Sequence, residues 1–296
     1  MKIASVIILA IILLLLVVYL LNRPQLNLVE AEIPEDFPRD TFSHTVFETL
    51  LKTYVDSAGQ VDYESWHASE NAQTRLNTYL AAVSRFSPDN AADRFATRSD
   101  ALAYWLYAYN AYVIKSVLDR WPLASVTDVK APVEFVKGFG FFYRQRYLFG
   151  ETPYSLYAVE NDKIRATYKD ARIHFVLNCG SESCPALRPE LPTGDELELF
   201  LQQAAFEFVS DERHVRIDHD SKRIILSEIF KWFEKDFIND LRKRGLPSDR
   251  GLVDYLSSIA GEKQRTELLK AADYDIAFEG YDWSLNDAAV KTSDSG

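Results

Sequence analysis

The sequence predicts a helix-rich α+β fold, with a single mixed domain and a small sheet behind an N-terminal transmembrane helix. Three observations predict it. An uncharged apolar run opens the chain, several later segments repeat apolar residues at helical spacing, and only a few short segments have the character of strands. Hydrophobic residues make up 47% of the 296 residues, which is enough to build a sizeable buried core.

Residues 1–22 are expected to form a transmembrane anchor. The uncharged run from Ile3 to Leu21 has 19 residues, close to the roughly 20 that cross a bilayer. A secretory signal has a shorter apolar core of about 7–15 residues and a small-x-small cleavage site, and no such site directly follows Leu21. Lys2 favours a cytoplasmic N-terminus. The membrane is therefore an expected partner, and the remaining chain is expected to be extracytoplasmic, which in a bacterium means the periplasm.

The next segment, residues 23–36, is expected to be a linker. It contains Pro24, Pro34 and several acidic residues, so an extended chain that lifts the domain off the membrane is predicted. No internal repeat and no change of composition divides residues 37–288. One globular domain is predicted there, followed by a polar tail at residues 289–296.

The first half of the domain is expected to be mostly helical. Apolar residues recur at helical spacing over residues 42–54 and 70–83. Residues 101–118 are apolar on nearly every side and follow a capping pair, Ser99-Asp100, so they predict a central buried helix. A strand is expected at residues 146–149, and a short helix begins after Ser155.

The second half is expected to mix strands and helices. Its predicted elements are a strand at 173–177, an amphipathic helix at 193–209, a hairpin of 215–218 with 223–226, helices starting at Ser227 and covering 251–258 and 263–271, and an edge strand at 274–278.

Charge and motifs exclude several classes of function. The net charge is -11 and no cluster of Lys or Arg forms a basic face, so a nucleic-acid partner is not expected. The sequence has no G-x-x-x-x-G-K-[ST], G-x-G-x-x-G, H-E-x-x-H or G-x-S-x-G motif, which removes most support for nucleotide binding, zincin and serine-hydrolase activity. A single pair of cysteines does not supply the four ligands of a structural zinc site, and no metal or cofactor is expected.

The run of residues 172–185 is the expected chemical site. It gathers both cysteines of the chain, Cys179 and Cys184, together with His174. The predicted strand at 173–177 would enter a polar turn that contains Gly180. In an oxidising compartment, the two cysteines are candidates for a disulfide that closes a small loop.

One hypothesis for this site is a papain- or transglutaminase-like thiol enzyme that acts on an amide or ester. Cys179 or Cys184 would be the nucleophile and His174 the base. The orienting group would be Glu160, Asn110 or Asp170, and backbone amides of the turn would form an oxyanion hole. Side chains alternate along a strand, which places His174 and Cys179 on opposite faces, whereas Cys184 is free of this objection.

The competing hypothesis, which we place first, is a non-catalytic binding or scaffold domain. The disulfide would brace the turn, and Arg172, His174, Asn178 and Asp170 would form a supporting polar network. The many Tyr and Phe residues would offer a recognition surface to a protein or peptide. A third hypothesis is thiol–disulfide exchange, although C-x4-C differs from the C-x-x-C spacing of thioredoxin-like sites.

Asn110 interrupts the most apolar predicted helix. A buried Asn without partners costs roughly 1–3 kcal/mol, so its amide must form hydrogen bonds. It would either brace a neighbouring loop or orient a catalytic group.

Five segments together resemble one family. They are residues 104–112, Ser155-Leu156 with Glu160, residues 170–185, residues 226–237 and residues 281–286. This set is similar to the domain of unknown function 547 family over roughly residues 45–288. The resemblance implies the fold and says little about activity. Tyr107 departs from the expected pattern, which has Trp-Ile-Asn where this chain has Trp105-Leu106-Tyr107, and a site at that position would be altered.

Overall fold

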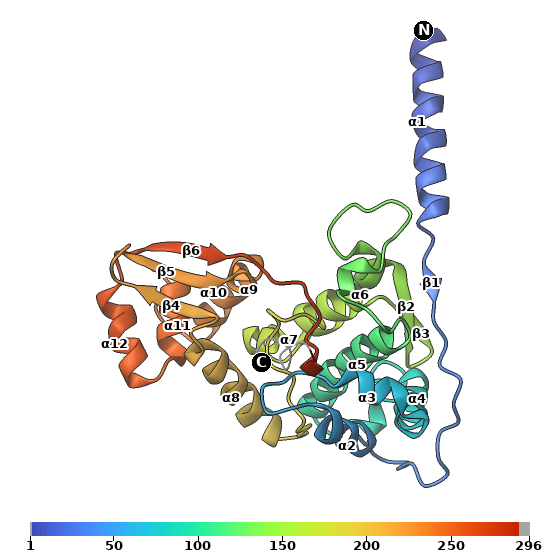
Figure 1. The fold of residues 1–296 in the computed structure, drawn as a ribbon, viewed down its shortest axis with the longest axis horizontal. Coiled ribbons are helices and arrows are strands. Elements are labelled where there is room, and N and C mark those ends of the chain that lie inside the picture. Colours follow the sequence, from blue (N-terminus) through green and yellow to red (C-terminus); the bar gives the residue numbers. More distant parts are fainter. Residues whose placement is uncertain (1, 290–296) are drawn as a thin grey trace.

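The computed structural model describes residues 2–289, with side chains described from Ser5 onward. Helix α1 (Lys2–Leu21) projects away from the rest of the molecule (Figure 1). An extended segment then runs along one side of the domain. The remaining elements form two groups, which are α2–α7 with β2 and β3, and α9–α12 with β4–β6, and α8 lies between them (Figure 1). The predicted α+β, helix-rich fold is confirmed.

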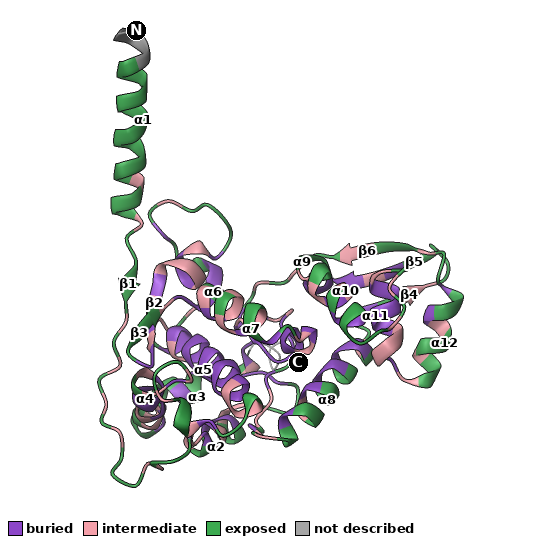
Figure 2. Cartoon of the chain, turned by 180° about the vertical axis from the view of Figure 1, so that it is seen from behind, coloured by how far each residue is buried: buried purple, intermediate pink, exposed green. Residues whose placement is uncertain are grey.

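Helix α5 (Arg98–Leu118) is the centre of the first group. Thr97 and Asp100 form a capping box at its start, so the N-cap is Thr97, two residues before the expected Ser99. From Leu102 onward nearly all of its side chains are buried, as Figure 2 shows in purple. The expected central buried helix is therefore confirmed.

Three helices and a small sheet pack around α5. The helices are α2 (Thr45–Tyr54), α3 (Tyr63–Ala68) and α4 (Glu70–Arg85). In the sheet, β1 (Gln25–Leu26) pairs in parallel with β2 (Gln145–Phe149), which pairs antiparallel with β3 (Thr152–Tyr154). The segment of residues 23–36 lies against the domain through β1.

Short helical segments connect β3 to the second group. They are α6 (Leu156–Ala158), the π-helical η4 (Val159–Arg165), α7 (Ala166–Tyr168) and the 3-10 helix η5 (Ala171–Phe175). Two further 3-10 helices, η1 (Ala92–Arg94) and η2 (Val126–Asp128), and the π-helical η3 (Phe139–Arg144) lie earlier in the chain.

The expected strand at residues 173–177 is wrong. Residues 171–175 form η5 because Asp170 accepts the backbone N–H of Arg172 and caps a helical turn. The apolar run Ile173, Phe175, Val176 and Leu177 is buried in that form. A short apolar run of this kind fits a buried helical turn as well as a buried strand. The strand-parity objection to a Cys179–His174 pair therefore does not apply.

The second group contains a second three-stranded sheet, so the fold has two small sheets in its described part rather than the one expected. Strand β4 (Val215–Asp218) pairs antiparallel with β5 (Arg223–Ser227), which pairs in parallel with β6 (Asp275–Glu279). The helices are α8 (Glu196–Ser210), α9 (Glu228–Trp232), α10 (Glu234–Lys243), α11 (Leu252–Ile259) and α12 (Glu262–Lys270). The predicted hairpin, helices and edge strand are confirmed.

The segment after β6 returns to the first group. Ser284 bridges to Ser125, Leu285 to Ser181, and Asp287 to Val61. Three distant parts of the chain are thus tied together by the last described residues. The expected polar tail falls almost entirely on residues 290–296, which lie outside the described residues.

Within the described part of the chain, no helix is both long enough and apolar enough to cross a membrane.

Candidate functional site

The loop that follows η5 is held in place by hydrogen bonds to Asn110 of α5. The side-chain amide of Asn110 donates to the carbonyl of Val176 at 3.0 Å, and its Oδ1 accepts the backbone N–H of Asn178 at 2.9 Å. Both bonds are buried. Asn110 therefore braces this loop, which is the structural alternative of the two that its position suggested.

Asn178 shapes the turn itself. Its Oδ1 accepts the N–H of Gly180 at 2.8 Å, and its Nδ2 donates to the carbonyl of Pro185 at 2.8 Å. Gly180 has φ +77°, a left-handed conformation that a residue with a Cβ adopts only with strain. The side chain of Asn178 therefore holds the two ends of the turn together through hydrogen bonds.

Cys179 and Cys184 are joined by a disulfide across this turn, with their Cα atoms 6.2 Å apart. The hydroxyl of Tyr281 lies 3.1 Å from each sulfur and accepts a hydrogen bond from Ser181 at 3.0 Å. Cys184 is buried and Cys179 is partly buried. The predicted pairing of the two cysteines is present in the structure, and both are oxidised.

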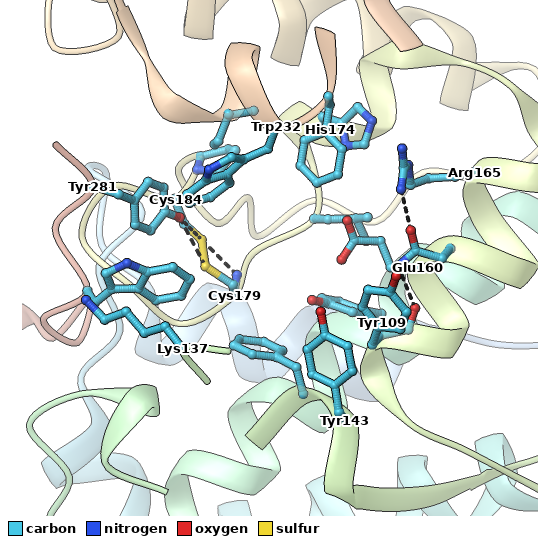
Figure 3. Close-up of a pocket in the computed structure, with 18 residues that line it drawn as sticks. Tyr109, Lys137, Tyr143, Glu160, Arg165, His174, Cys179, Cys184, Trp232 and Tyr281 are labelled. Atoms are coloured by element: carbon cyan, nitrogen blue, oxygen red, sulfur yellow. Dashed lines mark hydrogen bonds between the residues drawn. A yellow bond between two sulfur atoms is a disulfide. The ribbon is translucent and has the colours of Figure 1, made fainter. Parts of the chain in front are cut away.

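The disulfide forms part of the wall of a cavity of about 290 Å³ (Figure 3). The lining comes from segments far apart in the sequence: α5, η3, α6, η4, η5, the disulfide turn, α9 and the C-terminal segment. The lining residues are Tyr109, Lys137, Phe142, Tyr143, Tyr157, Glu160, Asn161, Arg165, His174, Leu177, Cys179, Cys184, Pro185, Ile229, Trp232, Phe233, Tyr281 and Trp283.

Eight of the 18 described residues that line this wall are Phe, Tyr or Trp. Tyr281 has its ring centroid 4.7 Å from that of Trp232 and 4.7 Å from that of Trp283. Elsewhere on the wall, Tyr143 and Tyr157 stack with centroids 4.2 Å apart. Such a lining favours a ligand with an apolar or flat body.

Among the described residues that line the pocket, Glu160 is the only acidic one. Figure 3 shows its carboxylate directed into the middle of the pocket. Burial raises its pKa to about 7, with Asp236 adding to the increase and Arg165 opposing it. No hydrogen bond to this carboxylate is formed by the residues that the structure describes. Near neutral pH it can therefore donate or accept a proton, or a hydrogen bond, toward a bound molecule.

His174 is buried and belongs to a partly buried cluster with Asp236 and Arg165. Its Nε2 lies 2.9 Å from Oδ2 of Asp236, and the same oxygen accepts from Nε of Arg165 at 2.7 Å. The imidazole stacks on Phe233 with ring centroids 3.8 Å apart. Burial lowers the pKa of His174, and the bond to Asp236 only partly offsets this effect.

Asp236 is the charge centre of this cluster. Its partial burial would raise its pKa, but the bonds from His174 and Arg165 outweigh that effect and bring the pKa to about 2. The carboxylate is therefore ionised across the physiological range, and it fixes which ring nitrogen of the neutral His174 carries the proton.

Residues 94–209 match the family described as "Protein of unknown function, DUF547". This match assigns residues 94–209 to the DUF547 family. This confirms the resemblance drawn from the sequence motifs, over a shorter range than the residues 45–288 expected. No curated protein matches the chain, and no solved structure matches it.

The DUF547 segment contains only part of the site. It carries α5, Glu160, His174 and the disulfide, whereas Asp236, Trp232, Tyr281 and Trp283 lie beyond residue 209. The pocket is thus completed by elements outside the matched range.

The structure brings together four of the predicted catalytic candidates, since Cys179, Cys184, His174 and Glu160 all line the pocket. His174 lies on the Arg165 side and the disulfide on the Tyr281 side (Figure 3). Among the described residues, no hydrogen bond joins His174 to either sulfur.

The predicted supporting network divides into two parts. Asn178 joins Asn110 beneath the turn, whereas Arg172 pairs with Asp170 at 2.6 Å and with Glu198 of α8 at 2.6 Å. Neither Asp170 nor Arg172 lines the pocket. Their ion pairs tie η5 to α8.

Sequence reasoning did not assign Arg165, Asp236, Tyr281 or Lys137 to the site. Two of these had a signal, because Asp236 and Tyr281 fall within segments that carry the family resemblance. Arg165 lies in a segment with no distinguishing pattern, whereas Lys137 lies in the aromatic, glycine-containing run of residues 135–142. No group of three or more His, Cys, Asp or Glu side chains suited to a metal ion occurs among the described residues.

Proposed function

We propose that this protein is a membrane-anchored, extracytoplasmic binding domain whose aromatic pocket, braced by the Cys179–Cys184 disulfide, holds a small ligand. The observation that carries the proposal is the carboxylate of Glu160. It faces an aromatic pocket without a hydrogen-bond partner among the described residues. A concave apolar site with a few convergent polar groups is the usual form of a small-molecule site.

The lining restricts the chemistry of the ligand. The rings of Trp232, Tyr281 and Trp283 fit a flat or apolar body. The carboxyl of Glu160, whose pKa is about 7, can donate a hydrogen bond to one polar group of the ligand or accept one from it. Lys137, whose ammonium lies 5.3 Å from the centroid of the Trp283 ring, supplies a positive charge beside the pocket. A peptide segment that presents a flat or apolar side chain with one polar group is also a proposed partner.

The anchor in this proposal is α1. Its 20 residues at about 1.5 Å each would extend about 30 Å, the thickness of a bilayer core. Described side chains begin only at Ser5, whereas the apolar run of the sequence begins at Ile3. Side chains from Val6 to Leu21 are largely exposed in the isolated chain. With Lys2 on the cytoplasmic side, the domain would lie in an oxidising compartment, which suits a disulfide.

A thermal-shift screen of small amphipathic compounds tests the binding proposal on the full chain in lipid nanodiscs. A ligand that binds only the folded state raises the melting temperature. Compounds that stabilise the wild type should lose their effect on Trp232→Ala and Glu160→Gln. They should keep it on Trp121→Ala, because Trp121 lies outside the pocket. The proposal is overturned if no compound acts, or if all of them act equally on Trp232→Ala.

A thiol enzyme is the second candidate function. One observation favours it, because both sulfurs share a pocket with His174 and with Glu160, whose pKa is about 7. Two observations weigh against it: the sulfurs are bonded to each other, and Nε2 of His174 is engaged by Asp236. An external dithiol would have to reduce the disulfide before either sulfur became a nucleophile.

Alkylation of the full chain in its native membrane, read by mass spectrometry, separates these candidates. The binding proposal expects both cysteines to resist labelling until the protein is reduced. Rapid labelling of one cysteine at neutral pH, slowed by His174→Ala, would instead support the thiol enzyme. Rapid reduction by a glutathione buffer would support thiol–disulfide exchange, which stays a prediction.

A further inference from the structure

The loop between η2 and η3, residues 129–138, exposes two apolar side chains at its tip. Phe135 is 60% exposed and its neighbour Val136 is 49% exposed. Lys130 and Lys137 flank them and are also exposed. The acidic residue of this loop, Glu134, is engaged, because it accepts the backbone N–H of Ala131. An apolar tip between two lysines is the composition of a segment that rests in a membrane interface.

This loop is fastened to the chain at the end of α1. Asn22, the residue after the helix, donates from Nδ2 to the carbonyl of Val133 at 3.1 Å. Its Oδ1 accepts the N–H of Val133 at 3.2 Å. Figure 1 shows the loop beside the foot of α1. The tip of this loop therefore lies beside the C-terminal end of α1 at Leu21. If α1 spans a membrane, the loop lies at the membrane surface from which the helix emerges.

The extended segment that follows α1 holds the domain close to the C-terminal end of this helix. The N–H of Asn27 donates to the carbonyl of Arg146 at 2.9 Å, and its side chain donates to Gln145 at 3.0 Å. Only a few residues thus separate the end of α1 from the first strand pairing. The domain has little freedom to move away from the end of the helix.

A continuous row of aromatic rings leads from the loop tip to the pocket. The centroids of Phe135 and Phe139 are 5.1 Å apart, those of Phe139 and Tyr143 are 5.3 Å apart, and those of Tyr143 and Tyr157 are 4.2 Å apart. Tyr143 and Tyr157 line the pocket. The exposed apolar tip and the pocket are therefore two ends of one apolar surface.

Besides the aromatic row, Lys137 also connects the loop to the pocket. It belongs to the loop, lines the pocket, and places its ammonium over the ring of Trp283. The ammonium is thus available to an anionic or zwitterionic head group at the edge of the pocket.

We infer that the loop of residues 129–138 rests in the interface of the bilayer that holds α1, and that the pocket takes a membrane-borne amphiphile along the aromatic row. This inference rests on the anchor and the binding pocket of the proposed function, and it adds the source and class of the ligand. The apolar part of the amphiphile lies on the rings, and its polar group reaches Glu160 or Lys137.

Photo-crosslinking from the lipid tests this inference. The full chain is reconstituted into phosphatidylcholine vesicles that contain a small share of a phosphatidylcholine with a diazirine at the end of one acyl chain. After irradiation, labelled peptides are mapped by mass spectrometry. We expect label on α1, on the loop with η3, and on the pocket segments of α6 with η4 and of α9.

Matched variants make the test specific. Phe135→Ser with Val136→Ser should lower labelling of the loop and pocket peptides several-fold and leave α1 labelled. Leu199→Ser is the control, because Leu199 of α8 is 69% exposed and lies outside both loop and pocket. It should change no label.

The outcomes separate this inference from the function on which it rests. If the chain does not float with the vesicles, the anchor fails and the inference fails with it. If α1 alone is labelled, the anchor stands and the inference is overturned. If the thermal-shift screen finds a soluble ligand while the pocket stays unlabelled by lipid, the binding function stands and the membrane source of the ligand is refuted.

Discussion

Asn110 of α5 and Asn178 of the disulfide turn are joined by a buried hydrogen bond of 2.9 Å, from the backbone N–H of Asn178 to Oδ1 of Asn110. The same amide also satisfies the carbonyl of Val176. Asn110→Ala would leave both backbone groups buried without a partner. We expect the free energy of unfolding to fall by about 3 kcal/mol, measured by urea denaturation. Asn239→Ala, on the exposed face of α10, is the control, and equal losses in the two variants would contradict the bracing role.

Glu160 should make stability depend on pH in the neutral range. Its folded-state pKa of about 7 lies above the ordinary 4.5, so its contribution is present below pH 4.5 and is lost as the pH rises through 7. Glu160→Gln removes this loss. We expect the variant to exceed the wild type by up to about 3 kcal/mol at pH 8, with little difference at pH 4. Thermal melts across this range measure it. Glu196→Gln, at an exposed site, controls for the loss of one negative charge, and a variant no more stable than the wild type at pH 8 would refute the assignment.

His44 should make stability depend on pH in the acidic range. It is buried against Tyr79, with Nδ1 2.8 Å from the Tyr79 hydroxyl, and burial lowers its pKa to about 3, partly opposed by Asp100. The unfolded chain binds a proton that the folded chain does not. Stability is therefore lost as the pH falls from 6.5 toward 3, by up to about 1.4 kcal/mol per pH unit.

In His44→Gln the unfolded chain no longer binds this extra proton, because glutamine does not titrate. The slope of unfolding free energy against pH between 6 and 4 should become shallower by up to one proton. His219→Gln, at an exposed position, should leave the slope close to that of the wild type. Urea denaturation at several pH values gives both slopes, and identical slopes for all three proteins would rule out the effect.

Gly140 should be required for the position of the loop beside α1. A Cβ at this position would lie 2.1 Å from the carbonyl oxygen of Val129 and 2.6 Å from the backbone nitrogen of Ala131. Gly140→Ala must therefore push the start of the loop away from η3. We expect a loss of about 1–3 kcal/mol in thermal or urea unfolding, typical of overpacked sites, together with weaker lipid labelling of Phe135. Gly280→Ala, where a Cβ would meet open space, is the matched control. Wild-type stability of Gly140→Ala would contradict this close approach.

The helices of this protein could be predicted where apolar spacing and caps agreed. Residues 101–118 are apolar on nearly every side and became the central helix, and the alternating residues around the polar turn at 219–222 became the β4–β5 hairpin. The strand predicted at residues 173–177 was wrong because its four apolar residues fit a buried 3-10 turn as well as a strand, and the hydrogen bond that Asp170 accepts from Arg172 favours the turn. The second sheet required a parallel pairing of β6 with β5 across some 50 residues, which no local pattern reveals.

The site could be predicted as far as local sequence reaches. Cys179, Cys184 and His174 are close in the chain, and they share the pocket. Arg165 and Asp236 are 71 residues apart, and only the tertiary packing of η4 against α10 brings their side chains together. Asp170 and Arg172 were grouped with the cysteines because they are close in sequence, but they lie outside the pocket, and Arg172 pairs with Glu198 of α8.

The C-terminal segment has a consequence for the order of assembly. Tyr281 and Trp283 form one side of the pocket, and Ser284, Leu285 and Asp287 tie down three segments that were synthesised long before. A nascent chain that stops short of these residues therefore has no complete pocket, however much of the core has formed. The proposed ligand binding therefore requires residues 281–287, and a protein truncated before Tyr281 would keep most of its helices and have an open site.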